Sequence, residues 1–235
     1  MNIADFLLAR GFAPENARLA ELLAAGTAET LYMTLGATLG AYLLGIPGGI
    51  ALALSDKRGL RPCAPLYRLL DVACNLLRSV PFIILLVVLI PFTRAVAGRS
   101  YGSTATIVPL VVSAAPFVAR LVESSLKEVD RGVVEAAESM GAGTARIVLR
   151  VLLPEARTSL VVGVTIALGT VLGYSAMAGA VGGGGLGDIA IQYGYYRYET
   201  RTMLLTLVLL VGVAQFLQWA GMRLARRLDR RRPAA

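Results

Sequence analysis

Residues 135–156 read EAAESMGAGTARIVLRVLLPEA, and an apolar segment lies on each side of them. Apolar side chains recur at helical spacing before Gly141, and Gly141 and Gly143 then interrupt the pattern. Residues 144–152 predict a second short helix, which we expect Pro154 to end because proline cannot continue a helical ladder. The stretch therefore predicts two short helices joined at a glycine turn, which form either a solvated surface hairpin or a docking element for a soluble protein.

The rest of the chain is strongly hydrophobic. Hydrophobic residues make up 56% of the 235 residues and charged residues only 16%, and the mean hydropathy is +0.67. These values are too apolar for a soluble domain and predict a polytopic membrane protein. The formal net charge is +8. In a membrane protein a basic excess marks cytoplasmic loops, and the chain lacks the basic and aromatic platform of a nucleic-acid-binding domain.

Five apolar runs are candidates for membrane-spanning helices, each of which needs about 20 residues. They cover residues 28–54, 69–92, 104–122, 159–181 and 202–222. The second run has only a short uncharged part and must extend upstream, which places Arg78 within or near the membrane. The fold class predicted from this pattern is an all-α polytopic membrane protein with five transmembrane helices.

Charge sets the predicted orientation and the segment boundaries. The basic run RLARRLDRRR after the fifth span predicts a cytoplasmic C-terminus, and an odd number of spans then puts the N-terminus on the periplasmic side. Residues 1–26 carry charges throughout and are expected to be a periplasmic or interfacial segment rather than a signal peptide. The membrane domain is expected over 27–218, with a cytoplasmic loop at 123–157 and a basic cytoplasmic tail at 219–235.

The sequence carries little of the chemistry that an enzyme or a metal site needs. It contains no histidine, and its two cysteines, Cys63 and Cys74, are not in a Cys-x-x-Cys pair. No metal site is expected from these residues. The sequence also has no P-loop and no nucleophile beside a general base, so the chain is not expected to be an enzyme.

The loop residues resemble the EAA loop of ABC importer permeases. The family pattern E-A-A-x3-G-x9-[I/V]-x-L-P is matched in full within residues 135–154. Segments such as RSVPF at 78–82 and GYSAMAGAV at 173–181 extend the likeness over roughly residues 27–225, where the chain resembles the permease subunit of methionine ABC importers. The residues that the resemblance assigns to coupling are Glu135, Ala136, Ala137, Met140, Gly141, Leu153 and Pro154.

The resemblance implies the architecture of a type I ABC importer. Two copies of this chain would form the pathway for D- or L-methionine, and two separate ATPase subunits would use ATP and Mg²⁺ on the cytoplasmic side. A periplasmic or lipoprotein substrate-binding protein would deliver the substrate, and the loop would be the coupling helix that enters a cleft of the ATPase. The chain itself would bind no cofactor and no nucleic acid, and it would lie among the lipids of the inner membrane.

A glycine-rich stretch follows the fourth predicted span. Residues 182–187, GGGGLG, match the spacing of a dinucleotide-binding motif, but no βαβ unit surrounds them. We therefore interpret Gly182, Gly184, Gly185 and Gly187 as a sharp turn on the periplasmic side.

Arg78, Ser175 and Met177 are candidates for the translocation pathway. An ionisable group at membrane depth is a functional candidate, and Arg78 either attracts the substrate carboxylate or simply caps a helix and extends to the interface. Met177 is flexible and polarisable, which suits a periplasmic gate as well as plain packing. Glycines four residues apart, such as Gly45 and Gly49 or Gly169 and Gly173, either pack helices within the chain or line a subunit interface or the pathway.

Two other functions stay open. A permease of this family could carry another amino acid or a small polar solute, because the binding protein often sets selectivity. An ATP-independent secondary transporter belongs to a different class and predicts acidic residues inside the spans. Asp71, near the inner end of the second run, is one of few such residues.

Overall fold

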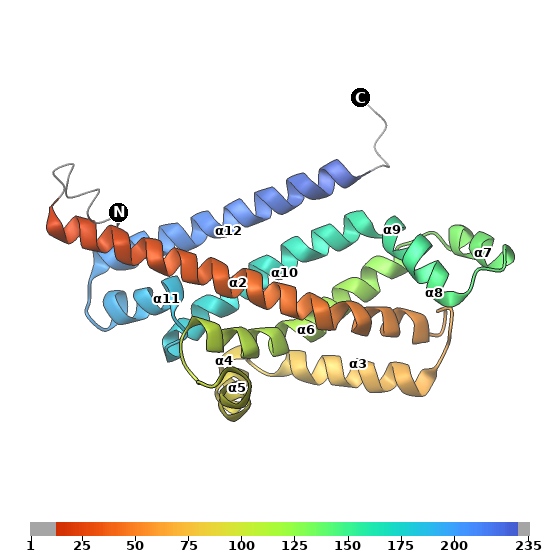
Figure 1. The fold of residues 1–235 in the computed structure, drawn as a ribbon, viewed down its shortest axis with the longest axis horizontal. Coiled ribbons are helices and arrows are strands. Elements are labelled where there is room, and N and C mark those ends of the chain that lie inside the picture. Colours follow the sequence, from red (N-terminus) through yellow and green to blue (C-terminus); the bar gives the residue numbers. More distant parts are fainter. Residues whose placement is uncertain (1–12, 230–235) are drawn as a thin grey trace. The chain divides into compact units, whose positions relative to one another are not determined.

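The computed structural model describes residues 13–229, and every regular element among them is helical (Figure 1). The longer helices are α2 (Pro14–Ser55), α3 (Ala64–Ser79), α6 (Ser103–Lys127), α10 (Arg157–Ala178) and α12 (Thr200–Leu228). The shorter helices are α4 (Phe82–Val88), α5 (Ile90–Ala97), α7 (Arg131–Ser139), α8 (Thr144–Ile147), α9 (Leu153–Glu155) and α11 (Gly185–Ile189). Two π turns, at Val148–Leu152 and Ala190–Tyr195, and a 3₁₀ turn at Gly179–Val181 complete the set. The predicted all-α class is confirmed.

The chain forms two compact units. The first unit contains the described residues up to Ala37 together with Phe82–Leu110 and Thr170–Phe216. The second unit contains Thr38–Pro81, Val111–Gly169 and the described residues from Leu217 onward.

Four helices of the described chain are long and apolar enough to cross a membrane, namely α2, α6, α10 and α12, and a fifth span results if α3 and α4 count as one bent pair. The continuous helix predicted over 69–92 is wrong. Helix α3 ends at Ser79, Val80 is extended with φ −77° and ψ 125°, and a new helix starts at Phe82. Pro81 explains the break, because proline disfavours helical geometry at the preceding residue and has no N–H to donate.

Helix α2 is longer than the first predicted span at 28–54. It starts at Pro14, a residue type suited to the first helical turn, and it continues without interruption past position 26, where the sequence pattern places a segment boundary. The periplasmic location of this segment stays a prediction. Residues 1–12 of the segment, and residues 230–235 of the basic tail, lie outside the described residues.

Glycines on α2 allow close packing against α6 in the second unit. A Cβ added at Gly49 would lie 2.5 Å from Val122 Cβ and 2.6 Å from the Ala119 carbonyl oxygen, which leaves no room for a side chain. This contact supports the interpretation of helix packing within the chain. A Cβ at Gly169 or at Gly173 would meet no atom of residues 13–229 within 4 Å, so the same interpretation does not hold for that pair.

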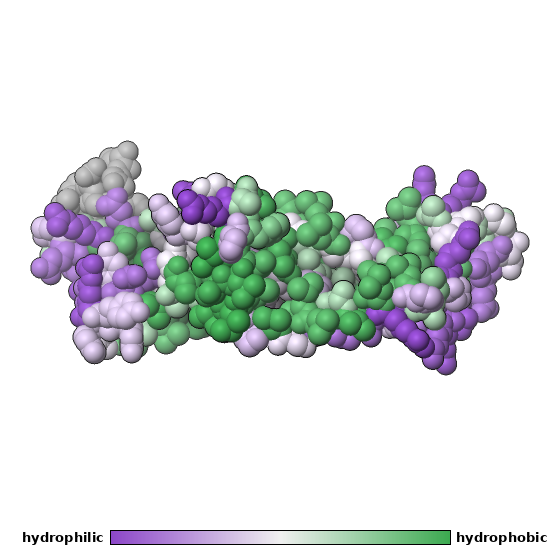
Figure 2. Space-filling model, turned by 90° about the horizontal axis from the view of Figure 1, so that it is seen from below, coloured by the Kyte–Doolittle hydropathy of each residue, from purple (hydrophilic) through white to green (hydrophobic). Residues whose placement is uncertain are grey.

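Hydrophobic side chains cover much of the face shown in Figure 2. Helix α3 exposes Leu69 at 68% and Leu76 at 64%, and α12 exposes Val208 at 66%. Water does not favour so much exposed apolar surface, whereas lipid or a partner subunit does. The surface therefore fits a protein that lies in a membrane.

Candidate functional site

The loop after α6 begins with helix α7. Asp130 caps its start, because Asp130 Oδ1 accepts a hydrogen bond from the Gly132 N–H at 2.7 Å. Ala137 is buried, whereas Glu135 is exposed and Met140 is 80% exposed. Helix α7 thus turns a small residue inward and presents an acidic and a thioether side chain outward, a mixture that suits an interface.

Helix α7 ends in a Schellman motif. The Gly141 N–H donates to the Glu138 carbonyl at 2.9 Å, and the Ala142 N–H donates to the Ala137 carbonyl at 3.1 Å. The motif needs a left-handed residue at Gly141, whose φ is +78°, and glycine takes this conformation without steric cost. Gly143 has an ordinary φ of −67°. The predicted glycine turn is present, and it depends on Gly141 alone.

The chain from Thr144 follows one helical path into α10. The sequence pattern predicts that Pro154 ends the second short helix, and this prediction is wrong. Residues 148–152 form a π turn ahead of Pro154, and the helical path continues through it. The Leu153 N–H donates to the Val148 carbonyl across this wider turn. A π turn gives the proline ring space beside the preceding turn, where a regular helix would force a clash and leave a missing hydrogen bond.

The second half of the loop is anchored on one side and open on the other. Ile147 is 1% exposed and Leu152 is 7% exposed, whereas Leu149 is 63% exposed. Arg61, which follows α2, donates from Nε to Thr144 Oγ1 at 3.1 Å and lines an open hollow beside α8. The loop is therefore anchored within the second unit, where it leaves the exposed apolar side chain of Leu149 next to a hollow.

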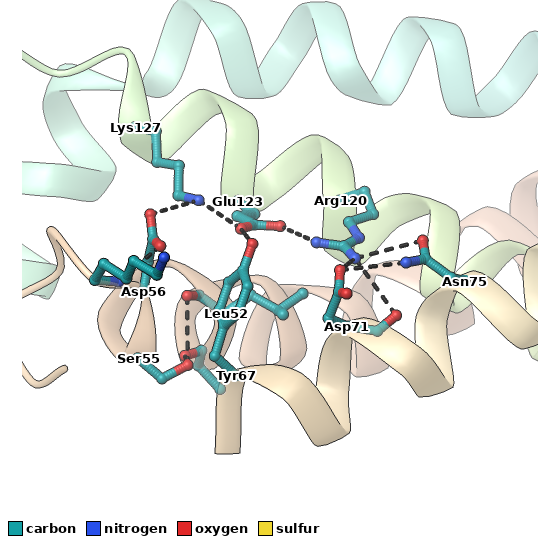
Figure 3. Close-up of polar contacts among 11 residues, drawn as sticks. Leu52, Ser55, Asp56, Tyr67, Asp71, Asn75, Arg120, Glu123 and Lys127 are labelled. Atoms are coloured by element: carbon teal, nitrogen blue, oxygen red, sulfur yellow. Dashed lines mark hydrogen bonds and ion pairs between the residues drawn. The ribbon is translucent and has the colours of Figure 1, made fainter. Parts of the chain in front are cut away.

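A cluster of polar side chains joins α6 to α3 and to the residue after α2 (Figure 3). We call it the α6 charge cluster, and its members are Asp56, Tyr67, Asp71, Asn75, Arg120, Glu123 and Lys127. The Glu123 side chain is 7% exposed. Its carboxylate accepts hydrogen bonds from Arg120 Nη1 and from Lys127 Nζ, both at 2.7 Å. The Tyr67 hydroxyl donates to the same carboxylate at 3.3 Å.

The cations of the cluster also reach the neighbouring elements. Arg120 Nη2 pairs with Asp71 on α3, and Lys127 Nζ pairs with Asp56 Oδ2 at 2.9 Å. The hydrogen bond from Lys127 holds the pKa of Asp56 below its usual range, although partial burial opposes this. Of these residues, the sequence pattern pointed only to Asp71, as an acidic residue near the inner end of the second predicted span. The missed signal is the spacing of Arg120, Glu123 and Lys127, which places two cations and an acid on one face of a helix end.

The three candidates for the translocation pathway differ in their surroundings. Arg78 is exposed, and its guanidinium carbon lies 5.8 Å from the centre of the Phe117 ring. Ser175 is 1% exposed, and its hydroxyl donates to the Leu172 carbonyl of its own helix at 2.8 Å. Met177 is 52% exposed. Arg78 and Met177 are thus exposed and Ser175 is buried, and the pathway role of all three stays a prediction.

The glycine-rich stretch of the first unit forms the sharp turn that the sequence predicts. Gly182, Gly184 and Gly185 have φ of +77°, +80° and +76°. Gly187 is needed for a different reason, because a Cβ there would collide with the backbone of Ala176. The periplasmic location of this turn stays a prediction.

Two side chains of α2 hold the glycine-rich turn. Glu29 Oε2 accepts the Gly185 N–H, and Thr30 Oγ1 accepts the Leu186 N–H, each at 2.8 Å. Asp188 lies beside them, and its Oδ1 has no hydrogen-bond partner among the described residues. Burial raises the pKa of Asp188 above its usual 3.8, the charge of Glu29 adds to the rise, and a hydrogen bond with a neighbouring glutamine opposes it.

Residues 45–232 match the model of a protein family described as the inner membrane component of binding-protein-dependent transport systems. The chain belongs to this family. Membership and the apolar helices together make this inner membrane component a multi-pass membrane protein.

Curated relatives of this inner membrane component match nearly its whole length. The probable D-methionine transport system permease protein MetI of Vibrio cholerae is 50% identical over 211 residues, which cover 90% of this chain and 94% of that protein. The protein with the same description from Pasteurella multocida is 46% identical over 214 residues, which cover 91% of this chain and 99% of that protein.

Solved structures agree with the family. A chain of the MetNI methionine ABC transporter in an inward-facing conformation superposes with a TM-score of 0.88 at 48% identity, and the match covers 89% of this chain and 97% of that one. An amino acid ABC transporter crystallised with histidines superposes with a TM-score of 0.71 at 18% identity, which shows a shared fold alone.

Proposed function

We propose that this inner membrane component is the permease subunit of an ATP-driven importer of methionine. Support comes from the identity of 50% with a probable D-methionine permease and 48% with a chain of a methionine ABC transporter, each across most of both chains. Two copies of the chain form the pathway, two separate ATPase subunits bind ATP and Mg²⁺, and a substrate-binding protein delivers the substrate. This chain itself performs no hydrolysis.

The exposed loop formed by α7, α8 and α9 is the observation that carries the proposal. Glu135 and Ala136 lie exposed on α7, and Met140 is exposed directly after it. The Gly141 turn fixes the direction in which the chain leaves the helix. We infer that this surface docks into the ATPase subunit. The helical path from Thr144 through the π turn into α10 contains no flexible linker, so movement of the docked loop passes directly to a spanning helix.

The orientation follows from charge. The loop at 123–157 and the basic C-terminal residues lie on the cytoplasmic side, where Lys and Arg are retained. The N-terminus and the glycine-rich turn then lie on the periplasmic side. In this arrangement the loop that carries the coupling residues, including Ala137, Leu153 and Pro154, lies on the side of the membrane where ATP is supplied.

Within the pathway, Arg78 and Met177 carry the chemistry of the proposal. The guanidinium of Arg78 attracts the carboxylate of methionine, and the exposed thioether of Met177 closes the periplasmic side as a gate. Ser175 lies on α10 with Met177, and its role is structural because its hydroxyl already donates to a backbone carbonyl of that helix.

Uptake into proteoliposomes tests the proposal. The chain is reconstituted with its co-purifying ATPase and its binding protein, and labelled D- and L-methionine are offered with ATP or with a non-hydrolysable analogue. We expect accumulation only with ATP. Hydrolysis without methionine uptake would reassign the permease to another amino acid or a small polar solute. Uptake that needs no ATP would indicate a secondary transporter and overturn the proposal.

A further inference from the structure

One carboxylate ties three parts of the second unit together. Glu123 on α6 binds Tyr67 of α3 directly, and through Lys127 it is joined to Asp56 after α2. Through Arg120 it is joined to Asp71 of α3 as well. Arg120 and Lys127 lie on α6 with Glu123, so loss of this carboxylate removes the direct link to Tyr67. It also leaves the pairs with Asp71 and Asp56 without the group that orients their two cations.

The α6 charge cluster is a weak source of folding stability. Its three carboxylates and two cations are partly removed from water, and Glu123 keeps only 7% of its side-chain exposure. Desolvation offsets much of the attraction within such groups, and apolar residues of similar volume often stabilise a fold as well or better. Directional charged hydrogen bonds do, however, fix the relative position of the elements that they join. The arrangement thus favours a positioning role.

The cluster lies directly beside the start of the coupling loop. Lys127 is the last residue of α6, and α7 begins at Arg131 after three residues. Two of these three residues remain hydrogen-bonded to the last turns of α6. The Glu128 N–H donates to the Ser124 carbonyl at 3.2 Å, and the Val129 N–H donates to the Leu126 carbonyl at 3.4 Å. A displacement of α7 is therefore transmitted to the cluster through a short and largely hydrogen-bonded connection.

We propose that Glu123 is a positioning residue that makes α3, α6 and the end of α2 move as one body when the ATPase displaces α7. The inference rests on the proposed function, and it adds a second route of transmission beside the helical path into α10. Without the Glu123 charge, α6 follows α7 while α3 lags, so hydrolysis drives less transport.

Three variants separate this role from ordinary packing. Glu123→Gln keeps the size of the side chain and removes its charge. Asp56→Asn removes only the link to the end of α2, at a side chain that is 26% exposed and outside the helix. Ser159→Ala is the matched control, because Ser159 Oγ lies 3.0 Å from Ser125 Oγ and joins α10 to α6 outside the cluster.

The readout is the number of methionine molecules accumulated per ATP hydrolysed, measured in proteoliposomes with the ATPase and the binding protein. The apparent unfolding temperature of each variant is measured alongside. We expect the ratio to fall about fivefold or more in Glu123→Gln, the lower end of typical coupling between sites, while hydrolysis continues. The fall is smaller in Asp56→Asn and absent in Ser159→Ala.

An unchanged ratio in Glu123→Gln would overturn the inference. If that variant does not assemble, Asp56→Asn decides in its place, and an unchanged ratio there has the same meaning. An equal fall in Ser159→Ala would assign the effect to general packing and also overturn it. Absence of ATP-dependent uptake by the unaltered chain is a different result, since it removes the proposed function itself and this inference with it.

Discussion

Replacement of Gly141 by alanine tests the backbone conformation of the turn after α7 without a change in side-chain packing. In the part of the chain that the structure describes, a Cβ at Gly141 would meet no atom within 4 Å, so the added methyl group causes no steric clash there. The backbone, by contrast, has a φ of +78°. An L-residue in the left-handed region costs about 1–2 kcal/mol, which lowers the population of the native turn by roughly 5- to 30-fold relative to alternatives.

The affinity of the chain for the separate ATPase subunit reports how far the population of the native turn has fallen. We expect Gly141→Ala to weaken the affinity of the detergent-purified chain for the ATPase about fivefold or more, because part of the binding energy must first restore the turn. Gly143→Ala is the matched control. Gly143 also has open space around its Cα, but its φ of −67° is ordinary, so its affinity is expected to stay unchanged.

Asparagine provides a graded check, since it tolerates the left-handed region better than alanine does. Gly141→Asn is expected to bind between the unaltered chain and Gly141→Ala. Equal affinities for Gly141→Ala and the unaltered chain would refute the argument that the Schellman turn presents the docking surface. Equal losses at Gly141 and Gly143 would show that side-chain volume, and not backbone conformation, decides binding.

Three further predictions concern other positions, and two of them include a control substitution. Gly49→Ala forces overpacking against α6 and is expected to destabilise by about 1–3 kcal/mol, whereas Gly48→Ala, with its nearest atom at 3.4 Å, is tolerated in the same thermal unfolding assay. Ile147→Ala opens a cavity at a side chain that is 1% exposed and costs about 2–5 kcal/mol; Leu149→Ala leaves the unfolding temperature unchanged and lowers ATPase affinity instead. Asp188 has a raised pKa when folded, so its contribution to stability is complete below pH 3.8 and is lost as the pH rises through the raised value. Asp188→Asn is therefore expected to raise the unfolding temperature at pH 7, and a gain that persists undiminished in acid would contradict this cause.

Hydropathy and local backbone chemistry were sufficient to predict most of the spanning helices and the turn at Gly141 from the sequence. The apolar runs that became α6, α10 and α12 could be recognised because a lipid core demands about 20 apolar residues per helix, a requirement that each segment meets alone. The turn at Gly141 could likewise be predicted, because its hydrogen bonds join residues at most five positions apart. The matched EAA pattern then indicated the family from the same local stretch.

Tertiary structure decided the features that depend on distant residues or on a choice between local alternatives. The helix breaks just before Pro81, whereas a π turn ahead of Pro154 accommodates that proline, and periodicity cannot distinguish these outcomes. Glycine pairs looked alike in sequence, yet only the fold shows Gly49 against the backbone of α6 and Gly169 in open space. Glu123 meets Arg120 and Lys127 on its own helix, but folding brings Tyr67 of α3 to Glu123, Asp71 of α3 to Arg120, and Asp56 to Lys127. The free energy of such a partly buried group depends on these distant partners as well as on the local ones.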